Sequence, residues 1–158
     1  MGYMPEGADV LTPYLILDDA AAAIEFYRKA FGAEEVMRLN APDSDAVMHA
    51  ELKIGGAMIM LSQENPDCGM VSAKSLGNSP ISLYIYVPDV DAACAKAVEA
   101  GATADMPVAD MFWGDRVGSV KCPHGFTWTF ATHIRTPTRE EIEAGARAMY
   151  EQMAAGNG

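Results

Sequence analysis

The residues best suited to chemistry are His49 and Glu51, which stand two positions apart in the segment VMHAELKI. An imidazole titrates near neutral pH, and a carboxylate beside it could orient it as a general base. Because this segment alternates polar and apolar residues, it predicts a half-buried strand with both side chains on one face. The pair therefore predicts proton abstraction or ligand hydrogen bonding, and a purely structural hydrogen bond remains the alternative.

The same alternation assigns the neighbouring side chains to faces. We expect the apolar side chains to meet helices and the others to line an open face. The expected helix-facing set is Met48, Ala50, Leu52 and Ile54, and the open set is Val47, His49, Glu51 and Lys53. In the run ISLYIYV the expected core set is Ile81, Leu83, Ile85 and Val87, and the open set is Ser82, Tyr84 and Tyr86.

Large hydrogen-bonding rings on an open sheet face favour a ligand site. If that face curves into a cup, an amphipathic cavity for a small organic molecule would be lined by Tyr84, Tyr86, Met58, Met60 and His49. Half-buried structural tyrosines are the alternative interpretation.

The segment FWGDR adds an aromatic ring and a cation. We expect Trp113 to cap the cup and Arg116 to meet any anionic ligand, because arginine stays charged and binds carboxylates bidentately. A local ion pair between Asp115 and Arg116 is the alternative. The remaining imidazoles, His124 and His133, are expected at surface or hairpin positions, and Trp128 is expected in the core.

Two spans that repeat each other must position these residues. Gly32 and Gly101 each end an alanine-rich amphipathic stretch opened by aspartates, and they lie 69 positions apart, as do Gly56 and Gly125. A shared offset at two landmarks indicates a duplicated unit. Each unit is predicted as strand, helix and three strands, so the expected class is α+β, with helices covering one sheet face.

Composition sets limits on partners and compartment. With 158 residues, 50% hydrophobic and 21% charged, the chain fits one compact domain. Its net charge of −11 predicts a field that repels nucleic acid and anionic membranes. The three cysteines, Cys68, Cys94 and Cys122, share no metal-type spacing and cannot all pair internally, which favours a reducing compartment, and we expect a cytoplasmic protein.

The segments DDAAAAIEFYRKAFGAE, DVDAACAKAVEAGA and FWGDRVGSVKCPHGFTW, set in this duplicated unit, resemble the glyoxalase, bleomycin-resistance and extradiol-dioxygenase superfamily. The resemblance covers roughly residues 10–134 and implies paired βαβββ modules around a curved, cup-shaped mixed sheet, with helices on its convex face. It also implies a homodimer. The C-terminal helix resembles an extension seen in one glyoxalase-like branch.

Metal-using relatives place a Glu four residues beyond the glycine of the last turn in each module, and a His or Gln early in the first strand. The corresponding positions hold Met60 and Thr129, and the first-strand positions fall near Thr12 and Ser82. Thioether and hydroxyl groups are poor ligands for hard cations. We therefore expect no metal or other cofactor, and we retain Met60 and Thr129 as ligand-lining residues. A displaced partial site at His49 and Glu51 is the alternative.

The predicted organisation is a single domain over residues 1–135 with a C-terminal helical extension over 136–158. Within the domain, modules at about 10–62 and 80–134 are joined by a loop at 63–79, interpreted as a linker or a lid. The extension has Thr138 and Glu141 in capping-box spacing. Its apolar stripe, expected to pack on its own sheet or across a dimer interface, is Ile142, Ala146, Met149 and Met153.

The function expected from these features is metal-free binding of a small organic molecule, without nucleic acid or membrane partners. Two alternatives stay open. One is a metal-free enzyme that uses His49 and Glu51 as acid and base. The other, implied by the resemblance, is a metal-dependent lyase, isomerase or dioxygenase.

Overall fold

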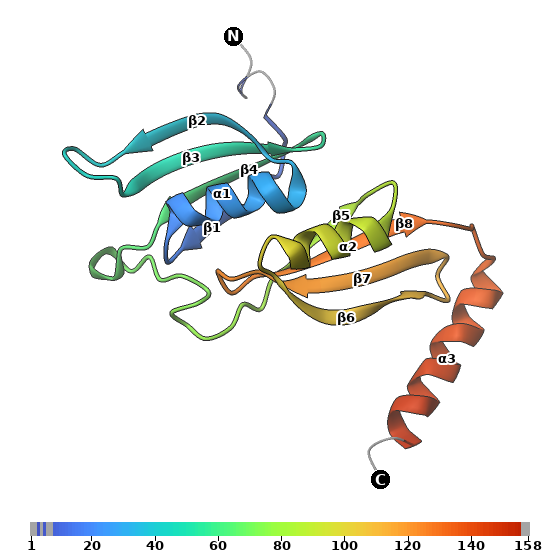
Figure 1. Cartoon of the computed structure of the whole chain (residues 1–158). Coiled ribbons are helices and arrows are strands. Elements are labelled where there is room, and N and C mark those ends of the chain that lie inside the picture. The colour runs from blue at the N-terminus through green and yellow to red at the C-terminus, as the bar shows by residue number, and fades with distance from the viewer. Residues whose placement is uncertain (1–2, 4, 6–7, 156–158) are drawn as a thin grey trace.

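A computed structural model describes residues 3, 5 and 8–155. Strand, helix and three strands occur twice along the chain, and a C-terminal helix follows (Figure 1). Module 1 consists of β1 (Tyr14–Leu17), α1 (Ala20–Phe31), β2 (Glu34–Asn40), β3 (Val47–Ile54) and β4 (Ala57–Gln63). Module 2 consists of β5 (Ser82–Tyr86), α2 (Val90–Glu99), β6 (Thr103–Asp110), β7 (Asp115–Lys121) and β8 (Thr127–His133). A 3-10 turn, η1 (Pro66–Cys68), lies between the modules, and α3 (Arg139–Ala155) comes last.

Local signals in the sequence fix both module helices. The carboxylates of Asp19 and Asp89 cap α1 and α2 by accepting hydrogen bonds from backbone N–H groups, at 2.9 Å from Ala22 and 3.0 Å from Ala92. Gly32 ends α1 with φ of 67°, a left-handed conformation that glycine adopts without steric cost. The predicted starts of both helices and the glycine end of α1 are therefore confirmed, whereas α2 ends at Glu99 and is capped by Ala100, one residue before the expected Gly101.

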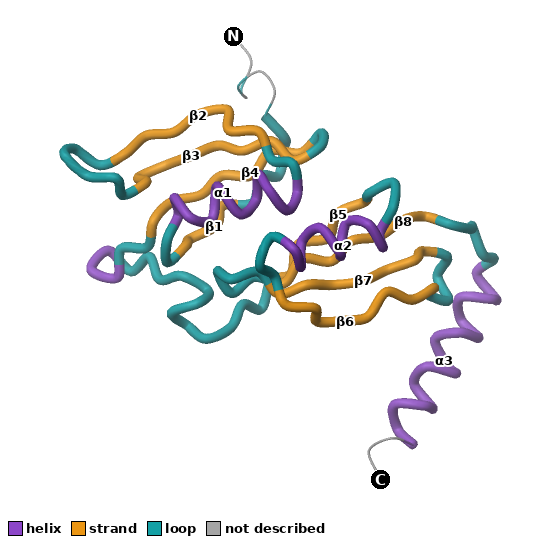
Figure 2. Tube along the Cα trace, viewed as in Figure 1, coloured by secondary structure: helices purple, strands orange, loops and turns teal. Residues whose placement is uncertain are grey.

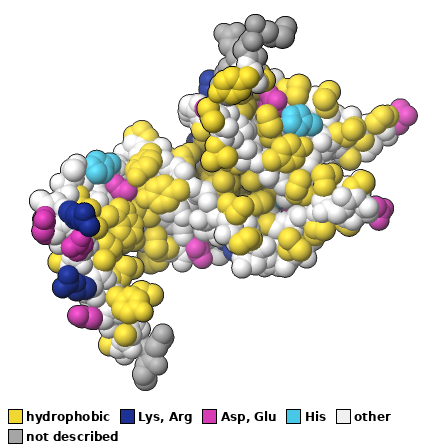
Figure 3. All heavy atoms as spheres, turned by 180° about the vertical axis from the view of Figure 1, so that it is seen from behind, with side chains coloured by type: hydrophobic (Ala, Val, Ile, Leu, Met, Phe, Trp, Pro, Cys, Tyr) yellow, Lys and Arg dark blue, Asp and Glu magenta, His cyan; other side chains and the backbone are white. Residues whose placement is uncertain are grey.

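Each module forms its own four-stranded mixed sheet, in the orders β1-β4-β3-β2 and β5-β8-β7-β6. In each sheet the first strand pairs in parallel with the last strand of its module, and the other pairs are antiparallel. The helices α1 and α2 pack against one another and cover the same side of the two sheets (Figures 1 and 2). The opposite faces of both sheets, here called the open faces, carry many hydrophobic side chains (Figure 3).

Side-chain alternation was predicted correctly for most of β3 but not for its start. Ala50, Leu52 and Ile54 are buried as expected, whereas Val47 is fully buried and Met48 is 60% exposed, the reverse of the prediction. The pairing register explains the error, because Asn40 opposes Val47 while Leu39 opposes position 49. This β-bulge inserts one extra residue and reverses the faces of the residues before it.

One further strand prediction needs correction. Ile81 was expected in the core, but it precedes β5 and is exposed. In the same sheet, β6 runs to Asp110 and contains Pro107. The sheet tolerates this proline because β6 is an edge strand, and the pairing with β7 is irregular between Met106 and Ala109.

The loop between the modules packs at their junction. The half-buried carboxylate of Asp18, just after β1, lies 2.7 Å from Lys74 Nζ in this loop and 2.8 Å from Nδ1 of His124 in the β7–β8 turn. His124 lies in the hairpin, one of the two positions expected for it, but it is only 5% exposed and is not a surface residue. A side chain at Gly125 would collide with the backbone of Lys74, which shows how closely loop and turn approach.

The C-terminal helix begins with the predicted capping box. The N–H of Thr138 donates to the Glu141 carboxylate at 2.6 Å, and the N–H of Glu141 donates to the Thr138 hydroxyl at 3.2 Å. Beyond a contact of Gly145 with Phe112, α3 extends away from both sheets and buries none of its described residues (Figure 1). None of the described helices combines the length and apolar character needed to cross a membrane.

Candidate functional site

A buried carboxylate organises the open face of module 2. Asp115 begins β7, lies opposite His133 of β8 and is 5% exposed. Its Oδ1 lies 2.8 Å from His133 Nδ1, and its Oδ2 accepts hydrogen bonds from the hydroxyls of Tyr86 at 3.1 Å and Tyr84 at 3.4 Å. The other ring nitrogen of His133 lies 3.0 Å from the hydroxyl of Thr136. One anion thus holds two tyrosine rings and an imidazole together.

The hydrogen bonds decide the charge of this group. Burial alone would raise the pKa of Asp115, but the bonds from His133 and the tyrosines outweigh it and hold the pKa below its ordinary value. The carboxyl is therefore ionised at neutral pH. Burial and then the negative charge of Asp115 raise the pKa of Tyr84, and the hydrogen bond to Asp115 raises that of Tyr86, so both phenols remain protonated donors.

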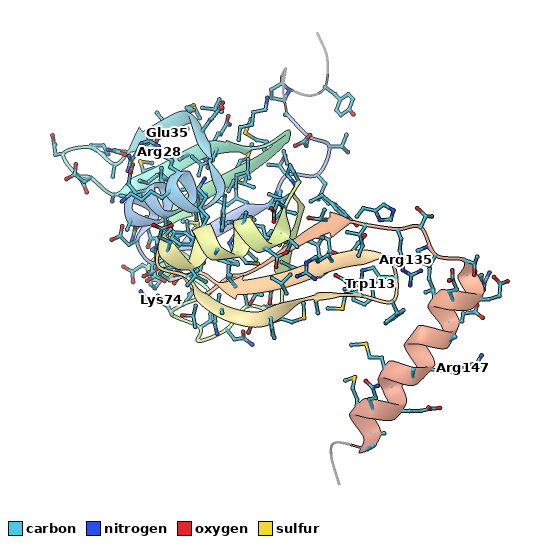
Figure 4. The ribbon with its side chains drawn as sticks, turned by 45° about the vertical axis from the view of Figure 1, so that its right-hand side comes forward. Arg28, Glu35, Lys74, Trp113, Arg135 and Arg147 are labelled. Atoms are coloured by element: carbon cyan, nitrogen blue, oxygen red, sulfur yellow. The ribbon has the colours of Figure 1, made fainter. Side chains whose placement is uncertain are left out.

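The predicted aromatic residues converge on this cluster. Tyr84 and Tyr86 stand edge to face, with ring centroids 5.5 Å apart and an interplanar angle of 63°. Trp113 lies in the turn before β7, close enough to Tyr84 for its side chain to lower the pKa of the phenol, against the larger effects that raise it. Figure 4 shows Trp113 and Arg135 at the end of module 2 from which α3 departs. Thr129 is the residue opposite Tyr84 in β8 and is half-buried.

Module 1 carries a second polar group on its open face. His49 and Glu51 share this face, with Nε2 of the imidazole 3.5 Å from Oε1 of the carboxylate. The hydroxyl of Tyr14 lies 3.2 Å from His49 Nδ1. Met60 is opposite both Glu51 and Tyr14 in the sheet. This arrangement can relay a proton among phenol, imidazole and carboxylate, and it includes Tyr14, which sequence reasoning did not single out.

Arg116 lies on the other side of the sheet. Because alternate strand residues face opposite ways, Arg116 points toward α2 while Asp115 points to the open face. Its guanidinium donates to both oxygens of Asp91, at 2.7 and 2.9 Å, and to Asp110 at 2.7 Å. These bonds raise the pKa of Arg116 further above its ordinary value. The structure therefore does not bring Arg116 to the tyrosines, and Asp115 and Arg116 do not form the local ion pair considered from sequence.

The residues compared with the family's metal ligands do not fit a divalent ion. Thr12 precedes β1 and Ser82 opposes Thr127, whereas the residues opposite Met60 and Thr129 are Tyr14 and Tyr84, so these positions offer only hydroxyl, phenol and thioether groups. Across residues 3, 5 and 8–155, no three His, Cys, Asp or Glu side chains converge closely enough to hold a metal. We derive no chemical step through a metal.

A cleft of about 240 Å³ lies where the two modules meet. Its walls come from the segment before β1, the β3–β4 turn and β5, and it includes the Tyr84 that also reaches Asp115. The Asp9 carboxylate fixes one wall by accepting a hydrogen bond of 2.8 Å from the N–H of Met58. The cleft is slightly smaller than typical drug-sized sites, which begin at about 300 Å³.

Comparisons with known proteins agree with this architecture. The sequence model of the Glyoxalase/Bleomycin resistance protein/Dioxygenase superfamily matches residues 9–130. An uncharacterized protein of Mycobacterium bovis is 42% identical over 137 residues, which cover 85% of this chain and 90% of that protein. The X-ray structure of an Arabidopsis thaliana gene product has 30% identity and a TM-score of 0.64, covering 78% of this chain and 98% of its own. TioX from Micromonospora sp. ML1 shares the fold at 24% identity and a TM-score of 0.61, covering 82% of this chain and all of its own. The chain therefore belongs to the glyoxalase/bleomycin resistance protein/dioxygenase superfamily.

Proposed function

We propose that this protein binds a small organic molecule on its open sheet faces, without a metal or other cofactor. The observation that carries the proposal is the group formed by Tyr84, Tyr86 and Asp115, in which two exposed rings are held by one buried carboxylate. Large amphipathic rings of this kind fix ligand orientation in small-molecule sites. We also place the protein in the cytoplasm, a location supported by cysteines that are all free thiols.

Tryptophan fluorescence tests the binding proposal directly. Trp113 is half-buried near the tyrosines, whereas Trp128 is 3% exposed and packs in the core against Tyr27 and Phe31. A ligand at the open face of module 2 should change the emission of the wild type and leave that of Trp113→Phe unchanged. A broad library of amphipathic compounds that changes neither emission nor thermal stability would contradict the proposal.

A second candidate function is acid–base catalysis on module 1. It is favoured by the continuous contacts from Tyr14 through His49 to Glu51. Each compound that binds should be incubated with the protein and followed by NMR for conversion. If the enzyme interpretation is right, His49→Ala abolishes conversion with little change in binding, and Tyr14→Phe reduces it less. Failure of every binder to react would contradict catalysis while leaving the binding proposal intact.

We further propose that the protein is a homodimer in which α3 packs on a second copy. The apolar residues of α3 recur at the four-three spacing of a helix-packing seam, and Met149 and Met153 remain exposed because α3 leaves its own sheets. Analytical ultracentrifugation should give a dimer for the wild type and for Ala144→Glu, which lies on the opposite helix face. Met149→Glu combined with Met153→Glu should give a monomer, and an unchanged dimer would contradict this interface.

A further inference from the structure

The open face of module 2 carries carboxylates, and the nearby guanidinium of Arg135 has other partners: it donates to the Phe112 carbonyl at 3.2 Å and lies 3.8 Å from Glu141. Asp115 is ionised there, and a second carboxylate, Asp105, accepts a hydrogen bond of 2.8 Å from the hydroxyl of Ser119. Arg116, the neighbouring cation, is held on the other side by Asp91. Along β7 the only lysine or arginine of the open face is Lys121, at the far end of the strand and roughly 20 Å from Asp115.

The tyrosine rings make this negative charge available to a ligand. Both phenols donate their hydroxyl hydrogens to Asp115, which shifts electron density toward the rings and strengthens their attraction for a cation. The rings are still accessible, because Tyr84 is 49% and Tyr86 is 64% exposed. The carboxylate therefore acts at short range through the rings, although its own oxygens are already occupied by donors.

Three classes of ligand meet different energies on this face. An anion would be repelled by Asp105 and Asp115, and the two guanidinium groups at this end, Arg116 and Arg135, are already paired with Asp91 and Glu141. A neutral molecule would gain only apolar contact with the rings. A cation would gain that contact, a cation–π attraction of about 0.5–2 kcal/mol, and attraction to a chain whose net charge is −11.

Given the ligand binding proposed above, on which this step rests, we propose that the ligand is an organic cation, a protonated or quaternary amine whose charged group lies on the rings of Tyr84 and Tyr86.

Three probes of nearly equal shape test the ligand class. Choline carries a trimethylammonium group, 3,3-dimethylbutan-1-ol replaces it with a neutral tert-butyl group, and 3,3-dimethylbutanoate carries a negative charge. Measured by ligand-observed NMR, choline should bind about tenfold more tightly than the alcohol. The carboxylate should show no binding, and the preference for choline should fall as salt is raised.

Matched variants locate the effect. Asp115→Asn should remove most of the preference for choline over the alcohol, whereas Asp91→Asn, on the helix side of the same sheet, should leave it unchanged. The salt dependence of the wild type supplies a test that needs no variant to fold. Equal binding of choline and the alcohol would overturn the cation inference and leave the binding proposal standing. Binding of none of the three also overturns it, and the fluorescence screen then decides the binding proposal separately.

Discussion

Replacing Gly114 with alanine should lower the free energy of unfolding by about 3–4 kcal/mol. Gly114 has φ of 99° and lies in the turn between Trp113 and Asp115, so its position sets theirs. A Cβ there would lie 2.1 Å from the carbonyl oxygen of Arg135 and 2.7 Å from Cδ of Pro137. The positive φ alone costs an alanine about 1–2 kcal/mol.

The collision supplies the rest of the loss. To make room, the chain after β8 must move away, which breaks the two hydrogen bonds of 3.0 Å that the N–H groups of Ile134 and Arg135 donate to the carbonyl of Gly114. Each bond contributes about 1 kcal/mol. The movement would also displace α3, which follows this segment.

Gly77→Ala is the matched control for this experiment. Gly77 also has a positive φ, 81°, but a Cβ there would meet no atom within 4 Å, so we expect a loss of only about 1–2 kcal/mol. Urea unfolding followed by circular dichroism should place the midpoint of Gly114→Ala about 1 M below that of Gly77→Ala. Equal midpoints for the two variants would refute the steric argument.

Two further predictions concern the module junction and the thiols. Asp18→Ala should cost about 2–3 kcal/mol, because it leaves the buried imidazole of His124 without its partner, whereas Lys74→Ala should cost less than about 1 kcal/mol because that ion pair is exposed. Burial alone would raise the pKa of Asp18, but its hydrogen bonds to Lys74 and His124 lower the pKa by more, so the net pKa is below the ordinary value of a carboxyl group. Its stabilising contribution is therefore complete above about pH 4 and is lost as the pH falls through the lowered value. Urea unfolding at a series of pH values should show this, and a cost of Asp18→Ala that stays constant from neutral to acidic pH would contradict it. Iodoacetamide should modify the exposed Cys68 in the native protein and Cys122 only after unfolding, since burial raises the pKa of the Cys122 thiol. Equal rates for the two thiols would argue against the packing of β7 on the core.

The elements were predictable because their signals are local. Aspartate caps located the starts of both module helices, and a glycine located the end of α1. Alternation of polar and apolar residues gave β3 its observed bounds, Val47–Ile54. The faces of Val47 and Met48 were not predictable in the same way. Their bulge arises from the pairing with β2, which depends on a partner strand that local alternation does not include.

The pairing of Asp115 with His133 in the candidate site was missed for a related reason. Asp115 was considered with its chain neighbour Arg116, although adjacent strand residues face opposite sides of a sheet. The informative partner was His133, which lies on the next strand. The hairpin around Gly125 contained that signal, because counting outward from Lys121 opposite Thr127 brings Asp115 opposite His133.

The duplicated backbone also explains why the two open faces differ chemically. Tyr14 and Tyr84 occupy the same rung of their modules, since one is opposite Met60 and the other is opposite Thr129 at the matching positions of the repeat. In module 1 the next residue across the sheet, opposite Met60 on β3, is a carboxylate, Glu51. In module 2 the residue opposite Thr129 on β7 is Ser119 instead. The carboxylate of this module is Asp115, at the start of β7, and the long tyrosine side chains reach it there.

The helix-facing sides have changed less than the open faces. Leu61 and Phe130, one residue beyond the matching rung in each module, are both buried and apolar. Packing against a helix restricts these positions to apolar side chains of suitable volume, because a cavity or an unpaired polar group there would cost several kcal/mol. The open faces carry no such restriction, so chemistry can diverge there while the scaffold persists. This division is the physical reason that membership of the superfamily identifies the fold of this chain and does not by itself identify what the open faces do.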